Sequence, residues 1–533
     1  MKEGTHKVLI GGTWREPRGP ARFFAAIDPA TGNSLPGLYP VSDFAELEEA
    51  LKAARGAAGE LLAFGPDGVA RFLDLFAAAA EARREELVAI AHRETALPEE
   101  PRLRSTEFPR LTDQLRQAAA ASRDRSWCRA TIDTKLDLRS KYGPLGGPVI
   151  VFSPNNFPFA FNAVGGGDFA AAVAAGNPVI AKANPGHPGT TRLLAEAAIE
   201  ALRASGLPAA LVQMVYHFEA RDGLRLVAHP LTAATAFTGS RSAGLQLKEA
   251  ADKAGKPISL ELSSLNPVFI LPGAAAERGP EIAAELAASC TLGSGQFCTK
   301  PGLVVLVDDG SGRSCLEALK RNFEAQPAGV LLAEPVLAGI QKSVDALLRA
   351  RATLVAGGRA VEGPGFRFAP TLFRTTGRLF LSAPEAFAVE VFGAFAVAVL
   401  ADGFDEMKEV AARLEGNLTA AVYSARSGED DALYDRLEPL LRVKVGRLLN
   451  DKMPTGVAVS PAMVHGGPFP ATGHPGFTSV GIPAALLRFA ALHGYDHVRP
   501  HRLPPELRDE NPTGRMWRLV DGEWTQRDVK PAL

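Results

Sequence analysis

The chain has few cysteines, and none of them are spaced to act together. Its 533 residues contain only Cys128, Cys290, Cys298 and Cys315, with no CxxC pair. Four isolated thiols in so long a chain form neither a disulfide framework nor a zinc site. We therefore expect reduced thiols, no bound metal and a cytoplasmic protein.

Long apolar runs and a charge imbalance are missing as well. The longest apolar stretches, residues 303–307 and 395–401, are too short to span a bilayer, and the N-terminal residues lack the apolar core of a secretory signal. The formal net charge of −1 offers no general attraction to nucleic acid or to an anionic membrane. These absences argue against membrane and nucleic-acid partners.

Familiar catalytic motifs are absent too. The sequence contains no GxSxG, HExxH, GxxxxGK[ST] or GxGxxG pattern. Hydrolase, zinc-protease and P-loop functions therefore lack their usual sequence support.

The patterning that is present is typical of an α/β protein of two or three domains. Short apolar strands alternate with helical segments between residues 147 and 240, and a second such series follows residue 298. This alternation implies right-handed crossovers and parallel sheets. Residues 131–139 alternate polar and apolar, which predicts an exposed hairpin or an edge that pairs with another subunit. The tail, 499–533, is rich in Pro, Arg and Asp and is expected to be extended or partly mobile.

Cys298 is the cysteine that a ligand could approach most easily. It follows Gly293, Ser294 and Gly295 on a glycine-rich turn, where a thiol is accessible and backbone N–H groups are free. The alternative is an inert buried thiol, the commoner role of a free cysteine, which we expect for Cys290 and Cys315.

Two polar residues at strand ends could assist such a nucleophile. Glu261 ends the strand-like KPISLEL and could act as a general base, although an isolated glutamate is more often a surface or salt-bridged residue. Asn156 lies between prolines just past a buried strand, where its amide could donate to an oxyanion. Its alternative role is turn formation.

Two further segments could hold a nucleotide. Lys182 ends the strand in VIAKAN, where a ribose or phosphate would sit in an open α/β sheet, or where a lysine could simply face solvent. Thr238, Gly239 and Ser240 precede a helix-like segment, and a turn of small residues at a helix N-terminus can bind phosphate.

Taken together, these segments resemble the aldehyde dehydrogenase superfamily in their order and spacing. The matching motifs are NNFP at 155–158, Lys182, FTGS at 237–240, ELSSLNP at 261–267, GQFCT at 295–299 and EVFG at 390–393. The longer stretches around them, including HPGT after the lysine and HGGP at 465–468, resemble the subgroup of α-ketoglutaric semialdehyde and NADP-dependent fatty-aldehyde dehydrogenases.

The resemblance implies a mechanism for the predicted residues. Cys298 would attack the aldehyde and carry a thiohemiacetal and then a thioester. The side chain of Asn156 and the backbone N–H of Cys298 would stabilise the oxyanion, and Glu261 would activate the hydrolytic water.

The resemblance also implies an NAD(P) cofactor. The residues expected to bind it are Lys182, Gly239, Ser240, Glu390 and Phe392. Pro185 stands where many NAD-preferring relatives have a glutamate, and Arg221 lies roughly where NADP-preferring relatives carry an arginine. We therefore expect NADP or NAD, with NADP slightly favoured, although Arg221 could instead be a solvated loop charge.

The implied fold is α/β and aldehyde dehydrogenase-like, with two Rossmann-like open parallel-sheet domains and a small β oligomerisation arm. The expected divisions are a cofactor-binding domain (1–121 and 142–261), a catalytic domain (262–482), and an arm with a C-terminal extension (122–141 and 483–533). A homodimer or homotetramer is expected.

The expected substrate is a semialdehyde such as α-ketoglutaric semialdehyde, with Phe159 and His465 lining its pocket. Its acidic end needs a cationic or N–H anchor that the sequence does not assign. A broad dehydrogenase of medium-chain or aromatic aldehydes is an alternative, as is an acylating enzyme that passes the thioester to coenzyme A. Glu261 argues against acylation, because acylating relatives often lack that base. A non-catalytic protein that keeps the fold is the third alternative.

Overall fold

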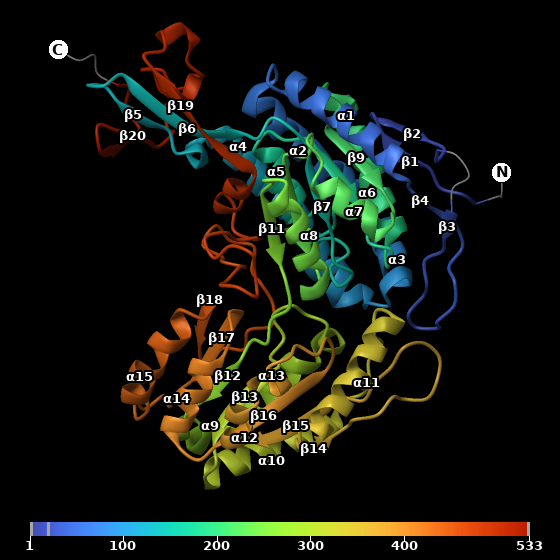
Figure 1. Ribbon diagram of the computed structural model, residues 1–533, viewed down its shortest axis with the longest axis vertical. Helices are drawn as coiled ribbons and strands as arrows, with labels where there is room; N and C mark the ends of the chain where they lie inside the picture. Colours follow the sequence, from blue (N-terminus) through green and yellow to red (C-terminus); the bar gives the residue numbers. More distant parts are fainter. Residues whose placement is uncertain (1–3, 19–21, 530–533) are drawn as a thin grey trace.

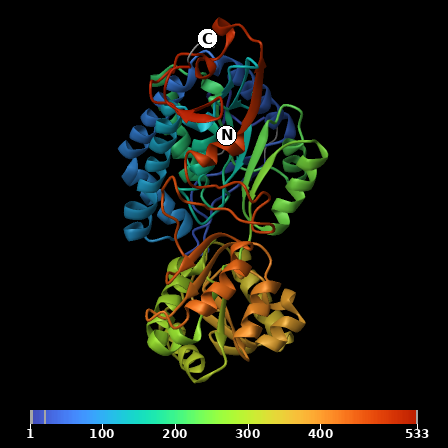
Figure 2. The ribbon, with the colours of Figure 1, turned by 90° about the vertical axis from the view of Figure 1, so that its left-hand side faces the viewer.

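The chain forms two lobes and a projecting arm in the computed structural model, which describes residues 4–18 and 22–529 (Figure 1). Figure 2 shows the lobes one above the other, joined at a narrow waist. Among the residues described, no helix is both long enough and apolar enough to cross a bilayer.

The first lobe is built on a seven-stranded sheet with strand order β11-β10-β7-β8-β9-β1-β2. Its parallel strands are β7 (Val149–Phe152), β8 (Val179–Lys182), β9 (Val212–Val215), β10 (Ala234–Thr238) and β11 (Ile258–Glu261), and β1 (Val8–Ile10) and β2 (Thr13–Arg15) continue it in antiparallel orientation. The parallel strands are short, mostly apolar runs because helices cover both faces of the sheet. Lys182 and Glu261 are the last residues of their strands, at the edge where such sheets bind ligands.

Helices pack on this sheet in two layers. One layer contains α2 (Gly65–Ala82), α3 (Arg84–Thr95), α4 (Phe108–Asp124), α5 (Gly167–Ala174) and α6 (Pro188–Ser205), and the other contains α1 (Phe44–Leu61), α7 (Ala220–Val227) and α8 (Arg241–Lys253). A π-helical segment, η1 (Glu99–Glu107), leads directly into α4, and a small two-stranded sheet pairs β3 (Arg22–Phe24) with β4 (Tyr39–Val41).

The second lobe repeats the plan with strand order β14-β15-β16-β13-β12-β17-β18. The strands are β12 (Val268–Ile270), β13 (Leu303–Val307), β14 (Thr353–Ala356), β15 (Thr371–Thr376), β16 (Phe395–Ala401), β17 (Asn417–Tyr423) and β18 (Val445–Asn450), all parallel except β14. Helices α9 (Pro272–Thr291) and α10 (Gly310–Ala325) cover one face, and α11 (Glu334–Arg349), α12 (Gly377–Ser382), α13 (Pro384–Phe387), α14 (Phe404–Arg413) and α15 (Asp431–Arg442) cover the other. The predicted α/β fold with two parallel-stranded sheets is therefore confirmed.

The arm is a five-stranded sheet that projects from the first lobe (Figure 1). It contains β5 (Thr131–Asp133), β6 (Leu138–Pro144), β19 (Ala490–Asp496), β20 (Arg518–Val520) and β21 (Glu523–Thr525). The predicted hairpin at 131–139 is the β5–β6 pair. The tail is more ordered than expected, because Arg518 is fully buried and donates hydrogen bonds to the backbone carbonyls of Arg508, Asp509 and Arg527.

A segment after β18 returns from the second lobe to the first. Leu262 N–H donates to the Ala471 carbonyl, and Glu261 forms an isolated bridge with Thr472. This returning segment, residues 451–489, therefore lies against the end of β11, between the two lobes.

Candidate active site

An open cleft of about 1450 Å³ separates the lobes at the carboxyl edge of the first sheet. The residues that line it include Asn156, Lys182, Gly239, Ser240, Glu261, Cys298, Glu390 and Phe392. Eight of the residues predicted from sequence thus lie around one cavity, although they come from strand ends and loops in both lobes.

The turn that carries Cys298 follows α9 and packs tightly against another loop. Ser294 and Gly295 both have positive φ angles, of 59° and 70°. A side chain at Gly295 would collide with the backbone carbonyl of Gly393, so only glycine permits this approach. The two family-like motifs, GQFCT and EVFG, therefore meet backbone to backbone.

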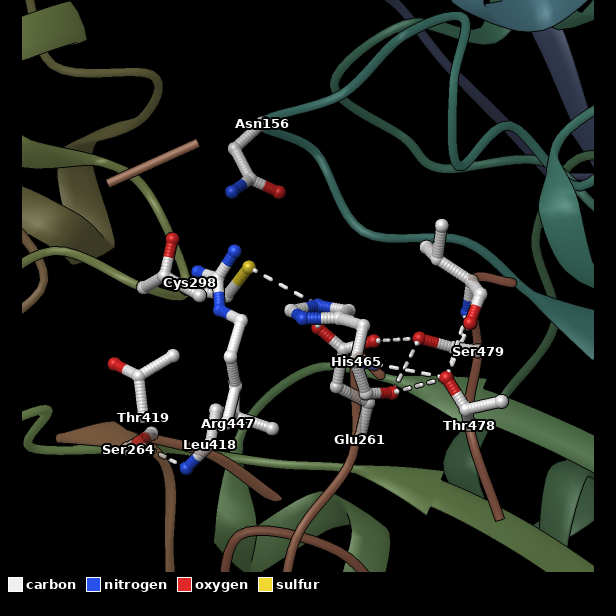
Figure 3. Close-up of polar contacts among 12 residues, drawn as sticks. Asn156, Glu261, Ser264, Cys298, Leu418, Thr419, Arg447, His465, Thr478 and Ser479 are labelled. Atoms are coloured by element: carbon white, nitrogen blue, oxygen red, sulfur yellow. Dashed lines mark hydrogen bonds and ion pairs between the residues drawn. The ribbon is translucent and has the colours of Figure 1, made fainter. Parts of the chain in front are cut away.

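Cys298, His465 and Glu261 form a single polar cluster (Figure 3). The Nε2 atom of His465 lies 3.4 Å from Cys298 Sγ and 2.6 Å from Glu261 Oε1. The Ser479 hydroxyl donates to the other carboxylate oxygen of Glu261 at 2.8 Å. Glu261 and His465 are buried and Cys298 is half-buried, so the proton positions of these three groups depend on one another.

The returning segment holds His465 in place. His465 N–H donates to the Thr478 hydroxyl at 2.8 Å, and Ser479 N–H donates to the His465 carbonyl at 2.8 Å. The same segment therefore supplies both partners of Glu261 from positions far away in sequence.

The environment shifts the pKa values of Cys298 and Glu261 in opposite directions. Burial raises the pKa of the Cys298 thiol well above its ordinary value, and the negative charge of Glu261 raises it further, while Arg110 lowers it. Burial also raises the pKa of Glu261, but the adjacent His465 and the hydrogen bonds from His465 and Ser479 outweigh it, so this pKa lies below its ordinary value. At neutral pH the cluster therefore contains a carboxylate beside a protonated thiol.

Asn156 and the Cys298 backbone can supply N–H donors near the sulfur. Asn156 lies beside Cys298 in Figure 3, and one N–H of its side chain donates to the Gln296 carbonyl at 2.9 Å. That bond fixes the amide and leaves its second N–H available. Within residues 4–18 and 22–529, the backbone N–H of Cys298 has no protein acceptor. The pair has the composition of an oxyanion hole.

Asn266 is a positioning residue that sequence reasoning missed. Its side-chain amide donates to the carbonyls of Cys298 at 2.8 Å and Lys300 at 3.0 Å. Its own backbone has a φ of 51°, which asparagine tolerates better than most residues. The Asn417 side chain accepts from Leu265 N–H and Asn266 N–H and so secures this loop to β17. The dipeptide Asn266-Pro267, directly after ELSSL, was the signal in the sequence that could have identified this residue.

The outer part of the cleft suits a nucleotide. Ser240 caps α8, so the turn at 238–240 presents a helix N-terminus to the cavity. Burial lowers the pKa of Lys182 to about 8 and raises the pKa of Glu390 to about 7. A lysine and a carboxylate on the cleft wall can donate to and accept from sugar hydroxyls, and the arrangement therefore fits a dinucleotide cofactor.

Two predicted residues lie away from this cleft. The side chain of Arg221, in the first turn of α7, is 83% exposed and does not line the cavity. Phe159 is fully buried in the core of the first lobe, where it packs edge-on against Phe108. The residues on either side, Phe157 and Phe161, instead belong to the apolar cluster that borders Cys298. The prediction that Phe159 lines the substrate pocket is therefore wrong.

His465 was predicted only to line the substrate pocket. In the structure it contacts both Cys298 and Glu261. Ser479 and Arg110 were not singled out from sequence. The HGGP segment at 465–468 was the available signal for His465.

Comparison with known proteins agrees with this geometry. The model of the "Aldehyde dehydrogenase family" matches residues 14–443. Alpha-ketoglutaric semialdehyde dehydrogenase 2 of Azospirillum brasilense is 37% identical over 531 residues, covering 97% of this chain and 99% of that protein. Alpha-ketoglutaric semialdehyde dehydrogenase of Acinetobacter baylyi is 38% identical over 469 residues, covering 86% and 87%.

Solved structures share the fold at lower identity. Lactaldehyde dehydrogenase from Escherichia coli superposes with a TM-score of 0.80 at 21% identity, covering 92% of this chain and 98% of its own. A mutant of aldehyde dehydrogenase C from Pseudomonas syringae, complexed with NAD+ and octanal, gives a TM-score of 0.80 at 20% identity, covering 94% and 99%.

Proposed function

The chain belongs to the aldehyde dehydrogenase family, and from this premise we propose that Cys298, Asn156 and Glu261 oxidise an aldehyde to a free carboxylic acid. The observation that carries the proposal is the cluster at the inner end of the cleft, where His465 Nε2 lies 3.4 Å from Cys298 Sγ and 2.6 Å from Glu261 Oε1. A thiol, a base and N–H donors converge there on the place where one carbonyl carbon would sit.

The first step forms the bond between sulfur and carbon. The thiol proton passes to the Glu261–His465 pair, and the sulfur attacks the aldehyde carbon. The carbonyl oxygen gains negative charge as the thiohemiacetal forms. The free N–H of the Asn156 amide and the Cys298 N–H donate to that oxygen. Loss of one such donor typically costs about 10²–10³ in rate.

The second step depends on the cofactor, and the last on Glu261. When bound, NAD(P) would supply the hydride acceptor for the oxidation that converts the thiohemiacetal on Cys298 into a thioester. Lys182, Gly239, Ser240, Glu390 and Phe392 would hold that cofactor in the cleft. Glu261 then takes a proton from water as the water attacks the thioester carbon, and the carbon–sulfur bond breaks to release the acid.

We infer that the cofactor is NADP in preference to NAD. Pro185 follows Lys182 where a glutamate would repel a 2′-phosphate, and Arg221 lies on the first turn of α7, after β9. The preference requires the 2′-phosphate to extend beyond the residues that line the cleft, to the exposed guanidinium of Arg221. Arg221→Ala is expected to raise the KM for NADP while leaving the KM for NAD unchanged.

We infer that the substrate is α-ketoglutaric semialdehyde. Support comes from the two relatives of that name, which align with most of this chain at 37% and 38% identity. The test is formation of NAD(P)H with this semialdehyde, an aliphatic aldehyde and an aromatic aldehyde, with and without coenzyme A. Cys298→Ala should abolish activity, and free acid should form without coenzyme A. Activity in Cys298→Ala, or none in wild type with any aldehyde, would refute the proposal.

We also infer a division of the chain by role. Residues 1–121 and 142–261 bind the cofactor, residues 262–482 carry the nucleophile, and the arm, residues 122–141 and 483–533, joins subunits. The strand β19 lies at the edge of the arm sheet, and Leu492 on it is 62% exposed. A second copy would cover this edge in a homodimer or homotetramer. Light scattering of wild type and of Leu492→Arg tests this, since the charge should dissociate the assembly.

The four free cysteines favour the reducing cytoplasm.

A further inference from the structure

Two arginines lie over an aromatic wall beside Cys298, formed by Phe157, Phe161 and Phe297. The guanidinium of Arg102 lies 4.5 Å from the ring centroid of Phe157 and 4.4 Å from that of Phe297. The guanidinium of Arg110, from the first turn of α4, lies 5.0 Å from the centroid of Phe161 and 5.6 Å from that of Phe157. Both cations therefore border the same apolar surface.

Their pairing differs. Arg102 Nε contacts Glu107 Oε2 at 3.2 Å, and its Nη2 donates to the Asn156 carbonyl at 2.7 Å. The other oxygen of Glu107 accepts from the backbone N–H groups of Phe159 and Ala160, so this carboxylate is fully engaged.

Arg110 has no such partner. In the described part of the chain it makes no ion pair or hydrogen bond, and its Nε and Nη2 atoms are shielded from solvent without an acceptor. Buried donors and buried charges are normally satisfied, because leaving them unpaired is costly. An unpaired guanidinium at a binding site is therefore expected to be completed by an anionic ligand.

We propose that Arg110 binds the carboxylate at the far end of the semialdehyde substrate and so selects oxo acids over uncharged aldehydes. This inference rests on the function proposed above for the same site. The planar guanidinium offers parallel N–H donors that match a carboxylate. The methylenes between the two ends of the substrate would lie against the aromatic wall.

The distances suit a five-carbon substrate. Phe161 lies near both ends of the site, with its ring centroid 5.0 Å from the Arg110 guanidinium and 5.8 Å from the centroid of the His465 ring. His465 in turn lies 3.4 Å from the sulfur. The terminal carbons of an extended five-carbon chain are about 5 Å apart. Such a chain can cross one phenylalanine ring between the sulfur and the guanidinium.

Electrostatics link the same two positions. Burial lowers the pKa of Arg110, but an arginine remains charged at neutral pH. Burial and the charge of Glu261 raise the pKa of Cys298, whereas the positive charge of Arg110 lowers it. Arg110 therefore lies close enough for its field to act at the reacting sulfur.

A third arginine near the sulfur is already occupied. Arg447, from β18, points toward Cys298 in Figure 3. Its Nη2 donates to the Pro454 carbonyl at 2.8 Å, and its Nη1 contacts the Gly456 carbonyl at 3.3 Å. Its guanidinium thus fixes the returning segment, which makes Arg110 the better anchor.

The test compares α-ketoglutaric semialdehyde with pentanal, an uncharged aldehyde of the same length. Arg110→Met keeps an apolar stem and removes the charge. It is expected to lower kcat/KM for the semialdehyde about 10- to 100-fold, chiefly through KM, and to leave pentanal unchanged or improved. Arg110→Lys should recover part of the loss. Arg84→Met is the control, because Arg84 lies 5.5 Å from the ring centroid of Phe108, which belongs to the core of the first lobe and not to the aromatic wall.

A binding measurement separates this inference from the proposed function. Glutarate, a five-carbon dicarboxylate, should bind the Cys298→Ala protein in calorimetry and should lose that binding when Arg110→Met is added. If no aldehyde is oxidised but glutarate binding depends on Arg110, the proposed function fails and the anchor stands. An equal loss for both aldehydes in Arg110→Met, or glutarate binding that survives the change, would overturn the anchor. Loss of selectivity in Arg447→Met but not in Arg110→Met would also overturn it.

Discussion

The Nε2 atom of His465 lies 3.4 Å from the sulfur of Cys298, although the two residues are 167 positions apart. The same nitrogen lies 2.6 Å from Glu261 Oε1. One ring nitrogen carries at most one proton, so the imidazole cannot donate to the carboxylate and accept from the thiol at the same moment. The thiol and the carboxylate therefore compete for this nitrogen, and a change at any of the three groups should alter the other two.

Replacing His465 tests this shared nitrogen. A glutamine can still donate an N–H to Glu261 but cannot take up a proton. We expect His465→Gln to lower kcat about 10²- to 10⁴-fold, the usual range for a proton-transfer group, while cofactor affinity is unchanged. Stopped-flow measurement of the first turnover checks this, with cofactor titration as the control. A kcat within twofold of wild type would show that Glu261 alone receives the protons.

The reactivity of Cys298 should depend on Glu261 in a defined direction. Because the carboxylate raises the pKa of the thiol, Glu261→Gln should lower that pKa and shift alkylation by iodoacetamide to lower pH. Mass spectrometry can assign the reaction to Cys298, because Cys128, Cys290 and Cys315 are buried, whereas Cys298 is only half-buried and lines the cleft. An unchanged alkylation profile would contradict the electrostatic coupling.

The cluster should also trap zinc. One ligand atom each from Glu261, Cys298 and His465 can lie within 4.8 Å of the others, and sulfur, imidazole and carboxylate are the ligands that Zn²⁺ prefers. We expect Zn²⁺ to inhibit the enzyme reversibly, with activity restored by a chelator, and Mg²⁺ to have no effect. His465→Gln should weaken zinc inhibition of the residual activity. Equal inhibition of wild type and variant would place the zinc elsewhere.

Asn266 should contribute both stability and rate. Asn266→Gly tolerates the positive φ but removes the amide that donates to the Cys298 and Lys300 carbonyls. Leaving a buried carbonyl unpaired costs about 1–3 kcal/mol, so the loss of both bonds should lower the free energy of unfolding, measured by urea denaturation, by about 2–6 kcal/mol. Activity should fall further in Asn266→Gly than in Asn266→Ser, because the shorter serine side chain keeps one hydrogen-bond donor. A stable Asn266→Gly with full activity would remove Asn266 from the site.

The segments nearest to the chemistry could be predicted from sequence because each has a local cause. A glycine turn before Cys298, a strand ending at Glu261 and a proline-flanked loop at Asn156 are short-range features. They line one cleft in the structure. The alternating phenylalanines show the limit of this reasoning. Phe157, Phe159 and Phe161 have similar local sequence, yet only the first and last border Cys298, because the core of the first lobe takes the middle one.

The charges could not be assigned in the same way. The sequence does not distinguish Arg102 from Arg110. Only the packing shows that Glu107 pairs with Arg102, while Arg110 has no partner in the part of the chain that the structure describes. A charged side chain acquires its role from the groups that exclude water around it and from the partners within about 4 Å. Both depend on segments far apart in the chain.

By itself, the sequence determined the alternation of strands and helices, the place of Cys298 on a glycine turn, and the family to which the chain belongs. The first two follow from short-range patterns, in which each residue's conformation depends on its neighbours. The family follows from the order and spacing of motifs between residues 155 and 393. The tertiary structure alone decided that His465 lies between Cys298 and Glu261 and that Asn266 holds the Cys298 carbonyl. It also decided that Arg110 lies over Phe161 without an ion-pair or hydrogen-bond partner among the described residues. The physical reason is that proton sharing and charge pairing act over a few ångströms, and only folding brings residues separated by more than a hundred positions that close.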